Sequence, residues 1–511
     1  MKKIFTSVIL LAFIWVNSNA QIPDWSTRIA SIIYNNCSSC HHAGGIAPFA
    51  LMNYSDVNGA AAAVLDAVTQ HRMPPWPADP SYMHFTNEAV LEQSEIDDIT
   101  TWINNGMPQG NLALAPDAPV YDVSGSVLDT IDYTVQIAPY TLQYNTDEYR
   151  FFAMHTNFSD TVYVSKIEVI AGLPEVIHHA DIYYDLSGQT FITDQLDPLS
   201  GFNNATGTMN TDKYMNAWQP GGNVVEYPHG WGIMVPPGAD FVFEIHYGPG
   251  HIGETDTTKM NLQFIPADEV ERQVHVGWLM NTPINGPLMI PADSVKVFNQ
   301  VTAPLGNDLS VISICPHMHH IGVSYRVWYE DATGDSIPLI DIPEWDFHWQ
   351  KYYTYQYVNH IPAGSTLRSE GVYDNTVNNL DNPNNPPVNV YSGPYTTNEM
   401  FLCYFIYAYY QPGDENILLD SSLLISSVEY EIDFSFDVFP NPVSNELMVN
   451  CYNQNLHSIS ITDVLGRNVF IQKENLNETN SLDVHELASG IYFITVKTVD
   501  GKASCKKLMK L

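Results

Sequence analysis

Two histidines one residue apart, His317 and His319, are the first candidates for chemistry in this chain. They belong to an alternating apolar run from Leu309 to Trp328, a pattern that predicts a β-strand. Because successive side chains of a strand point to opposite faces, both imidazoles are expected on one face. Two imidazoles so placed are a partial ligand set for a transition metal. Taken alone, the pair is explained equally well by two ordinary, partly buried histidines.

Further ligands can come from His178 with His179, from His246 and from Met400. A thioether combined with imidazoles suits copper, because soft sulfur favours Cu(I) and imidazole accepts both oxidation states. Taken singly, His246 is an ordinary strand residue and Met400 an ordinary core methionine. The neighbours His178 and His179 would point to opposite faces of a regular strand. Both can bind one ion only where the strand ends or bulges.

In chain order, four motifs resemble those of the copper type II, ascorbate-dependent monooxygenases, the family of peptidylglycine alpha-hydroxylating monooxygenase and dopamine beta-monooxygenase. The motifs are His178-His179, His246-Tyr247-Gly248, His317-x-His319-His320-x-Gly322 and Glu399-Met400, and the resemblance covers about residues 140 to 412. It implies two copper ions, one in each of two β domains. The electron-transfer copper would be held by His178, His179 and His246. The copper at which O2 binds would be held by His317, His319 and Met400.

The residues expected to bind the substrate differ from the family pattern. In the peptide-amidating members an arginine, an asparagine and a tyrosine clamp the substrate carboxylate, and the matching positions here hold Cys315, Leu402 and Tyr404. Only the tyrosine is retained, beside the oxygen-binding copper. A bidentate carboxylate clamp is not expected without its arginine. The resemblance therefore implies O2, a reductant such as ascorbate or another electron donor, and an unknown small-molecule or peptide substrate other than a glycine-extended peptide.

A second kind of metal chemistry is indicated by Cys37, Cys40 and His41, which form a C-x-x-C-H motif. Two thiols at this spacing can form thioethers with the vinyl groups of haem, and the histidine that follows can ligate the iron. The two cysteines could instead form a local disulfide or half of a zinc site, but no second C-x-x-C motif follows in the sequence. The motif predicts covalently bound haem c.

The sixth haem ligand should come from further along the chain. Met73 is expected, because the two prolines that follow it stiffen the backbone holding the thioether. His71 and Met107 are the alternatives. Apolar spacing predicts helices over 26–35 and from Ser94 to about Gly106. A short helical segment with this motif resembles a small c-type cytochrome.

The first twenty residues predict export. A basic start at Lys2 and Lys3, an apolar run too short to span a bilayer and an ending at Ala20 are typical of a secretory signal peptide. The formal charge of −37, from 57 acidic and 20 basic residues, argues against nucleic acid as a partner.

The predicted fold class is multidomain, since 511 residues exceed what one core usually organises. A small all-α cytochrome c-like domain precedes two all-β jelly-roll or sandwich copper domains and a small all-β sorting domain. Alternating runs such as 162–170 and 240–247, separated by Gly, Pro and Asn clusters, predict the strands. The expected ranges are a signal peptide at 1–20, a haem domain at 21–111, a linker with a first strand at 112–139, copper domains at 140–285 and 286–425, a linker at 426–435 and a sorting domain at 436–511.

The last segment resembles the C-terminal sorting domain of type IX secretion. The features that carry this resemblance are Phe439-Pro440-Asn441-Pro442, the turn at 463–467, Ser489-Gly490-Ile491-Tyr492 and a lysine-rich end. The resemblance implies export through the outer membrane, the type IX secretion machinery as a partner, and release or attachment at the cell surface.

Together these features predict an exported copper monooxygenase that hydroxylates an unactivated C–H bond with O2 and receives electrons through its fused haem. The alternative is a cell-surface electron-transfer or copper-binding protein without oxygenase activity. A glycan-binding adhesin is a third reading, which leaves the C-x-x-C-H motif without a role. Cys315 with Cys403, and Cys451 with Cys505, could form disulfides in an oxidising compartment, or remain separate thiols.

Overall fold

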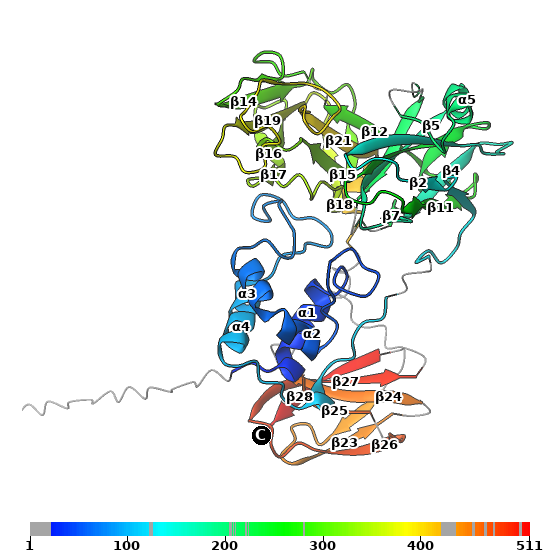
Figure 1. Ribbon diagram of the computed structural model, residues 1–511. Coiled ribbons are helices and arrows are strands. Elements are labelled where there is room, and N and C mark those ends of the chain that lie inside the picture. The colour runs from blue at the N-terminus through cyan, green and yellow to red at the C-terminus, as the bar shows by residue number, and fades with distance from the viewer. Residues whose placement is uncertain are drawn as a thin grey trace, which may run out of the picture.

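The computed structural model describes residues 22–121, 126–203, 207, 209, 211–219, 222, 224–279, 282–420, 436–451, 455–463, 468–473, 476–499 and 503–511. The predicted signal peptide, the linker at 426–435 and most of the turn at 463–467 lie outside these residues. Most of the described chain is β-strand, with a small helical unit at the N-terminal end and a small β unit at the C-terminal end (Figure 1). No helix in this part of the chain is long and apolar enough to cross a membrane.

The helical unit has one apolar core, in which Ile99 and Trp102 are fully buried. Its elements are η1 (Trp25–Ile29), α1 (Ala30–Asn36), α2 (Tyr54–Gly59), α3 (Ala61–Thr69) and α4 (Gln93–Asn104), followed by η2 (Leu112–Leu114). The first predicted helix is present as η1 and α1. The second begins earlier than Ser94, because Glu92 caps it by exchanging hydrogen bonds with Glu95.

The first β-sandwich follows. Its elements are β1 (Tyr133–Gln136), β2 (Tyr140–Thr141), β3 (Glu148–Met154), β4 (Val162–Ile170), β5 (Ile177–Asp185), α5 (Gln189–Leu196), β6 (Lys213–Trp218), β7 (Val225–Glu226), β8 (Trp231–Val235), β9 (Asp240–Tyr247), β10 (Thr255–Asp256), β11 (Lys259–Ile265) and β12 (Arg272–Leu279). A sheet of order β3-β9-β5-β6 packs against β1-β11-β4-β8. Strands β4 and β9 have the bounds that their alternating pattern predicts.

The second β-sandwich packs the sheet β14-β19-β16-β17 against the strands β12-β21-β15-β18. Its further elements are β13 (Met289–Ile290), β14 (Ser294–Val301), β15 (Leu309–His317), β16 (Gly322–Glu330), β17 (Ser336–Ile342), β18 (Tyr353–Ile361), β19 (Thr366–Asn375), β20 (Val390–Tyr391), β21 (Leu402–Tyr409) and η3 (Asp414–Asn416). The aromatic segment that follows Met400 forms β21.

One sheet runs through both sandwiches. Strand β12 pairs in parallel with β8 of the first sandwich and antiparallel with β21 of the second. The central strands bury both of their faces: Ile312 and Ile406 pack in the first core, whereas Val311 and Phe405 pack in the second. Strands buried on both faces are apolar along their whole length, and this explains the long apolar run that contains the candidate histidines.

That run is not a single strand. β15 ends at His317, a turn follows, and β16 begins at Gly322. The turn is tight: a Cβ atom on Gly322 would lie 2.8 Å from the Met318 side chain and 3.0 Å from that of Trp345. His319 therefore lies in the turn and not on the strand face that periodicity predicted.

The helical unit is anchored to the second sandwich by the segment between α3 and α4. Phe85 is 1% exposed and belongs to the core of the second sandwich, where its ring packs against Tyr353 and Tyr355. The Thr86 amide donates to the Thr354 carbonyl at 2.8 Å, and Phe85 forms an isolated antiparallel β-bridge with Tyr355. The two units therefore share buried apolar area as well as backbone hydrogen bonds.

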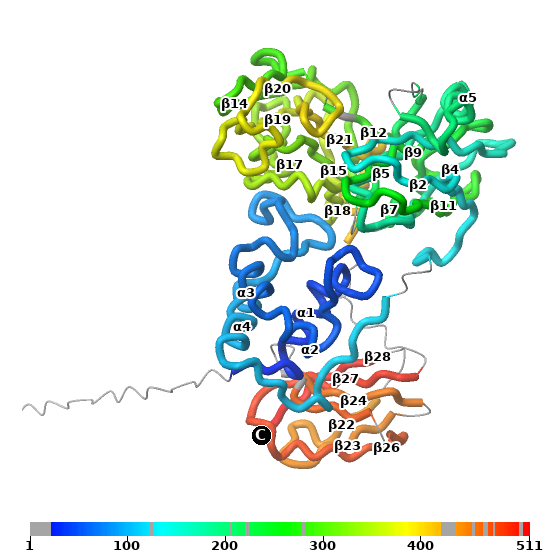
Figure 2. The backbone as a smooth tube through the Cα atoms, in the orientation of Figure 1, coloured from blue at the N-terminus to red at the C-terminus, as the bar shows by residue number. Residues whose placement is uncertain are grey.

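The C-terminal unit is a small sandwich with its own core. Its strands are β22 (Asp437–Phe439), β23 (Glu446–Asn450), β24 (Leu456–Asp463), β25 (Asn468–Gln472), β26 (Thr479–Asp483), β27 (Gly490–Thr498) and β28 (Ala503–Lys510), in sheets β22-β23-β26 and β25-β24-β27-β28. The chain after α4 runs beside this unit before it reaches the first sandwich (Figure 2). Lys473 and Asp117 form an ion pair there.

The substitution Phe85→Ala should loosen the anchor of the helical unit. Removing a buried aromatic ring costs about 3–5 kcal/mol, so the denaturation midpoint of the strand region should fall. Protease cleavage between α3 and α4 should become faster. Val90→Ala, at a side chain that is 42% exposed, is the control and should leave both unchanged. If Phe85→Ala and Val90→Ala had the same denaturation midpoint and the same cleavage rate, this segment would not hold the helical unit and the second sandwich together.

Candidate metal centre

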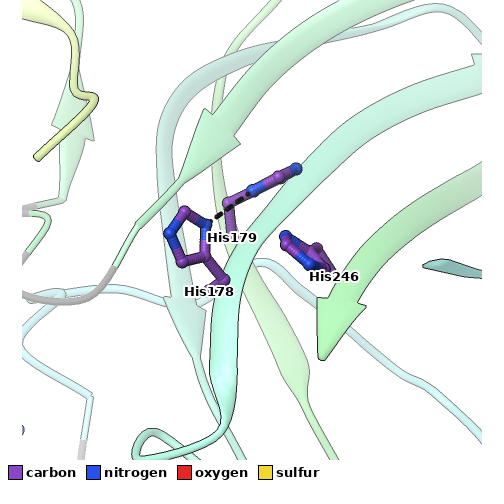
Figure 3. A group of neighbouring side chains, drawn as sticks. All are labelled: His178, His179 and His246. Atoms are coloured by element: carbon purple, nitrogen blue, oxygen red, sulfur yellow. Dashed lines mark hydrogen bonds between the residues drawn. The ribbon is translucent and has the colours of Figure 1, made fainter. Parts of the chain in front are cut away.

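Strands β5 and β9 bring three histidines together (Figure 3). One ring nitrogen from each of His178, His179 and His246 lies within 4.8 Å of the other two. The register between the strands shifts between Ile177 and His179, so His178 is the extra residue of a β-bulge. This is the irregularity that two adjacent ligands require. It turns both side chains toward His246, which lies directly opposite His179.

His246 is held in one orientation by two neighbours. Its Nε2 lies 3.0 Å from the carboxylate of Asp147, and the ring of Tyr149, directly opposite on β3, stacks on it at 4.2 Å. A carboxylate only accepts, so Nε2 carries the proton and Nδ1 the lone pair. That Nδ1 is buried and has no hydrogen-bond partner among the residues that the structure describes. A buried lone pair beside two further imidazoles suits a metal ligand.

Burial, followed by neighbouring imidazoles, keeps the other two rings neutral. It lowers the pKa of His178 to about 3 and the pKa of His179 well below its ordinary value. The two Nδ1 atoms are 3.2 Å apart, so both can lie at about 2.0–2.1 Å from one ion. Three neutral nitrogen donors fit copper.

The second pair, His317 and His319, lies at the end of β15 and in the turn that follows. Their ring centroids are 5.1 Å apart and the rings are perpendicular. The His319 Nδ1 lies 3.1 Å from the Asn398 carbonyl oxygen, which only accepts, so the lone pair is on Nε2. Burial lowers the pKa of His317 to about 4 and that of His319 to about 3. Here too the imidazoles are neutral donors.

A buried carboxyl group holds this turn beside the segment that contains Met400. The two oxygens of Glu399 accept from the amides of His319 at 2.8 Å and Ile321 at 2.9 Å. Burial raises the pKa of Glu399 to about 8, although backbone amides oppose the rise. The backbone of Met400 is fixed in turn by the Tyr373 hydroxyl, which donates to its carbonyl oxygen at 2.6 Å. The structure thus brings the backbone of Met400 next to the histidine pair.

One loop, residues 343–352 between β17 and β18, contacts both histidine groups. The ring of Phe347 lies 4.7 Å from His178 and 4.1 Å from His320. In the same loop, the Trp345 indole donates to the His319 carbonyl at 3.2 Å. Phe347, which is 8% exposed, thus contacts His178 of the first group, and its ring centre lies 6.1 Å from that of His319 in the second group.

The face that carries the histidines also carries two carboxyl groups. Asp181 on β5 lies directly opposite Glu244 on β9. Burial raises the pKa of Glu244 to about 7 and that of Asp181 well above its usual range. The Tyr214 hydroxyl donates to Asp181, and its ring stacks on Tyr404 of the second sandwich at 5.0 Å. Tyr404 therefore faces carboxyl and tyrosine side chains.

All six cysteines are free. Cys315 lies directly opposite Tyr404, whereas Cys403 lies opposite Pro316. Neighbouring residues of a strand point to opposite faces, so Cys315 and Cys403 are adjacent in register but on different faces of the sheet. Cys451 and Cys505 also remain separate thiols.

The C-x-x-C-H motif forms one helical turn after α1. The amides of Cys40 and His41 both donate to the Cys37 carbonyl, at 3.2 and 3.0 Å, so the three side chains emerge close together. The His41 Nδ1 lies 3.0 Å from the Phe49 carbonyl, which leaves Nε2 as the lone pair. Burial raises the pKa of the Cys37 thiol to about 12. Two free thiols and an oriented imidazole fit haem c.

The three candidates for the sixth haem ligand differ in their surroundings. Met73 is 40% exposed, on the segment that follows α3. His71 is close by and has a backbone φ of 54°. Met107 packs against the helical core, and its carbonyl accepts from the Tyr54 hydroxyl at 2.9 Å.

Comparison with known families identifies the last part of the chain. Residues 437–510 match the secretion system C-terminal sorting domain. This segment is a type IX sorting domain. The protein is therefore exported, to the medium or to the cell surface, and its sorting domain engages the type IX secretion machinery. The match falls within the predicted range of 436–511.

The other comparisons add little. No curated protein matches the chain. Among solved structures, the PBSX exported protein XepA has 11% identity and a TM-score of 0.13, over 50% of this chain and 88% of that one. The BSP domain of a biofilm associated protein has 9% identity and a TM-score of 0.13, over 76% and 84%. The major capsid protein P2 from Bacteriophage PM2 has 8% identity and a TM-score of 0.20, over 52% and 99%. Scores this low support no statement about this chain.

Sequence reasoning missed the residues that orient the histidines. Asp147, Tyr149 and Phe347 lie outside the four motifs and reach the imidazoles only through the fold. Glu399 stands beside Met400, but nothing in the sequence indicates that its carboxyl group accepts from backbone amides of a distant turn. A cross-strand partner such as Tyr149 follows from the register of β3 and β9, which cannot be read from one strand alone.

Replacing one histidine of the first group should remove one bound metal ion. After dialysis against copper, His179→Ala should retain about one equivalent fewer than the parent protein, measured by elemental analysis. His155→Ala, which changes a largely exposed histidine paired with Asp240, is the control and should keep the parent content. Unchanged copper in His179→Ala would remove this group from the metal sites.

Asp147→Asn should weaken the same site without removing a ligand. An amide holds the His246 ring less firmly than a carboxylate, and loss of such a partner typically weakens metal binding by about 10–100-fold. Competition with a chromophoric copper chelator measures the change. Asp160→Asn, on an exposed turn, should bind as the parent does. An affinity equal to the parent's in Asp147→Asn would mean that the carboxylate does not orient the ligand.

Proposed function

We propose that this exported protein is a copper-dependent monooxygenase that uses O2 to hydroxylate a C–H bond and receives electrons through a haem c in its N-terminal unit. The observation that carries the proposal is the pair of histidine groups on two sandwiches, both of which lie near Phe347 of one loop. Their residues are those that the resemblance to the copper type II monooxygenases singles out. As part of this proposal, the two sandwiches are copper domains and the helical unit is a cytochrome c-like domain.

In the proposed assignment, His178, His179 and His246 hold one copper ion, and His317, His319 and Met400 hold the other. Bound copper would supply reactivity toward O2 and one-electron chemistry, and the overall reaction converts R–H, O2, two electrons and two protons into R–OH and water. The residues of the chain position the donors. Asp147 presents Nδ1 of His246, and the Asn398 carbonyl presents Nε2 of His319.

The two histidine groups differ in ways that fit their two proposed roles, electron transfer and reaction with O2. The first is built on paired strands and has three imidazoles, a set suited to exchanging electrons with little rearrangement. The second combines imidazoles on a turn with a thioether, which favours the reduced copper that meets O2. Glu399 ties that turn to the segment of Met400, so both parts of the ligand set are held by one buried carboxyl group.

The surroundings of Tyr404 support a substrate without a carboxylate. Where the peptide-amidating members have an arginine, this chain has Cys315. The side chains that meet Tyr404 across the interface include Tyr214, which donates to the carboxyl group of Asp181. The Asp181 carboxyl group, whose pKa burial raises well above its usual range, offers no positive charge to pair with a substrate carboxylate. Glycine-extended peptides therefore remain poor candidates.

One contact supports the helical unit as the proposed electron donor. Haem c attached to Cys37 and Cys40 would supply one electron at a time. The loop that carries Phe347 also carries Lys351, whose ammonium lies 3.9 Å from the centre of the Trp76 ring of the helical unit. The segment that joins the histidine groups thus also contacts the haem unit.

The test is a stopped-flow experiment on the mature protein, reduced at its haem and freed of reductant, then mixed with oxygenated buffer. Haem absorbance should report reoxidation at least tenfold faster with copper bound than with copper removed. His319→Ala should abolish the acceleration, whereas His360→Ala, a histidine of β18 paired with Asp308, should retain it.

If copper makes no difference, the proposed link between haem and copper is wrong. Electron transfer or copper binding at the cell surface, without oxygenation, then becomes the better account. Acceleration that survives in His319→Ala would instead place the reaction with O2 at another site.

A further inference from the structure

Phe347, on the loop of residues 343–352, is a buried aromatic residue that lies outside the apolar cores. It is 8% exposed, yet it belongs to none of the four apolar cores that the described residues form. A buried aromatic ring ordinarily adds its apolar area to such a core. In the described part of the chain, its ring contacts are instead with imidazoles, those of His178, His319, His320 and His348. Core packing therefore does not account for the burial of Phe347.

His178 is the ligand of the first group that Phe347 touches most directly. The two rings stack with their centres 4.7 Å apart and their planes 19° apart. The Nδ1 of His178 lies 3.2 Å from that of His179, and its Nε2 is buried without a hydrogen-bond partner among the described residues. His246, by contrast, is held by a carboxylate and by a stacked tyrosine ring. Stacking on Phe347 therefore takes the place that a hydrogen bond has at His246 in fixing the plane of the imidazole.

The loop that carries Phe347 is fixed to the second sandwich beside the second histidine group. The amide of Trp345 donates to the Val323 carbonyl at 2.8 Å, and its indole donates to the His319 carbonyl at 3.2 Å. The buried side-chain amide of Gln350 donates to the Phe347 carbonyl at 2.8 Å. The position of the Phe347 ring is thus set by the second sandwich, although the ring stacks on a ligand of the first.

We propose that Phe347 is a positioning residue of the first metal site, supplied by the second sandwich, and that its ring holds His178 in the plane that directs Nδ1 toward the ion. The proposal rests on the proposed copper centre but not on its reaction with O2. Groups that orient a ligand without touching the metal contribute to metal affinity. The first site is then complete only when both sandwiches are in place.

The experiment measures copper at the first site alone, in the full mature protein carrying His317→Ala. This background removes a ligand of the second group and keeps the backbone that holds the loop. Phe347→Leu keeps an apolar side chain but loses the ring, whereas Phe347→Tyr keeps the ring. Phe191→Ala is the matched control, because the Phe191 ring lies 5.4 Å from that of His155, a histidine outside both groups.

Two measurements read the site. Competition with a chromophoric copper chelator gives the affinity, and electron paramagnetic resonance of bound Cu(II) reports the arrangement of its nitrogen ligands. Phe347→Leu should bind copper about three- to tenfold more weakly, as expected for one stacked aromatic pair, and its copper hyperfine splitting should shift. Phe347→Tyr and Phe191→Ala should keep the affinity and the spectrum of the background protein. Thermal melting of the metal-free proteins checks that each variant is folded.

The proposal is overturned if Phe347→Leu keeps the affinity and the spectrum of the background protein. It is also overturned if Phe347→Leu and Phe347→Tyr weaken binding by the same factor, because the stacked ring would then make no difference. If the background protein itself binds no copper, the proposed metal centre falls together with this proposal. If copper binding depends on the Phe347 ring but copper does not accelerate haem reoxidation, the positioning role stands and the proposed oxygenase is refuted.

Discussion

The sheet that runs through both sandwiches is the constraint on which the rest of the structure depends. Strand β12 pairs with β8 on one side and β21 on the other, so the two sandwiches cannot hinge freely about a linker. β5 and β9 carry one histidine group, and the end of β15 carries the other. The separation of the two groups is thus set by strand pairing. This differs from a pair of domains whose relative position is adjusted by a flexible connection.

Part of this arrangement could be predicted from the sequence. The alternating patterns of β4 and β9 predicted these strands with the bounds that the structure has. The bulge at His178 followed from chemistry, since two adjacent ligands of one ion cannot lie on a regular strand. The break after His317 was not predicted, because the central strands bury both faces and their continuous apolar pattern hides where one strand ends. The two short helices α2 and α3 were also not predicted.

The partners of the histidines were beyond sequence reasoning for a different reason. Asp147 and Phe347 are 99 and 169 residues from the histidines that they contact, His246 and His178. Such contacts depend on loop positions that no local pattern specifies. Burial adds to this: in a chain with a net charge of −37, it keeps the pKa values of His178 and His179 low although carboxyl groups lie on the same face of the sheet.

The central strands, which bury both of their faces, also determine the order in which the protein can fold. The core of the first sandwich contains Ile312, Val358, Ile406 and Ala408, which lie far downstream of its own strands. Its packing is therefore incomplete until the chain up to residue 408 is available. The sorting domain begins at residue 437, shortly after that point. The sorting domain is synthesised only after that point, so any chain that carries the complete sorting domain also contains every buried residue of the first core.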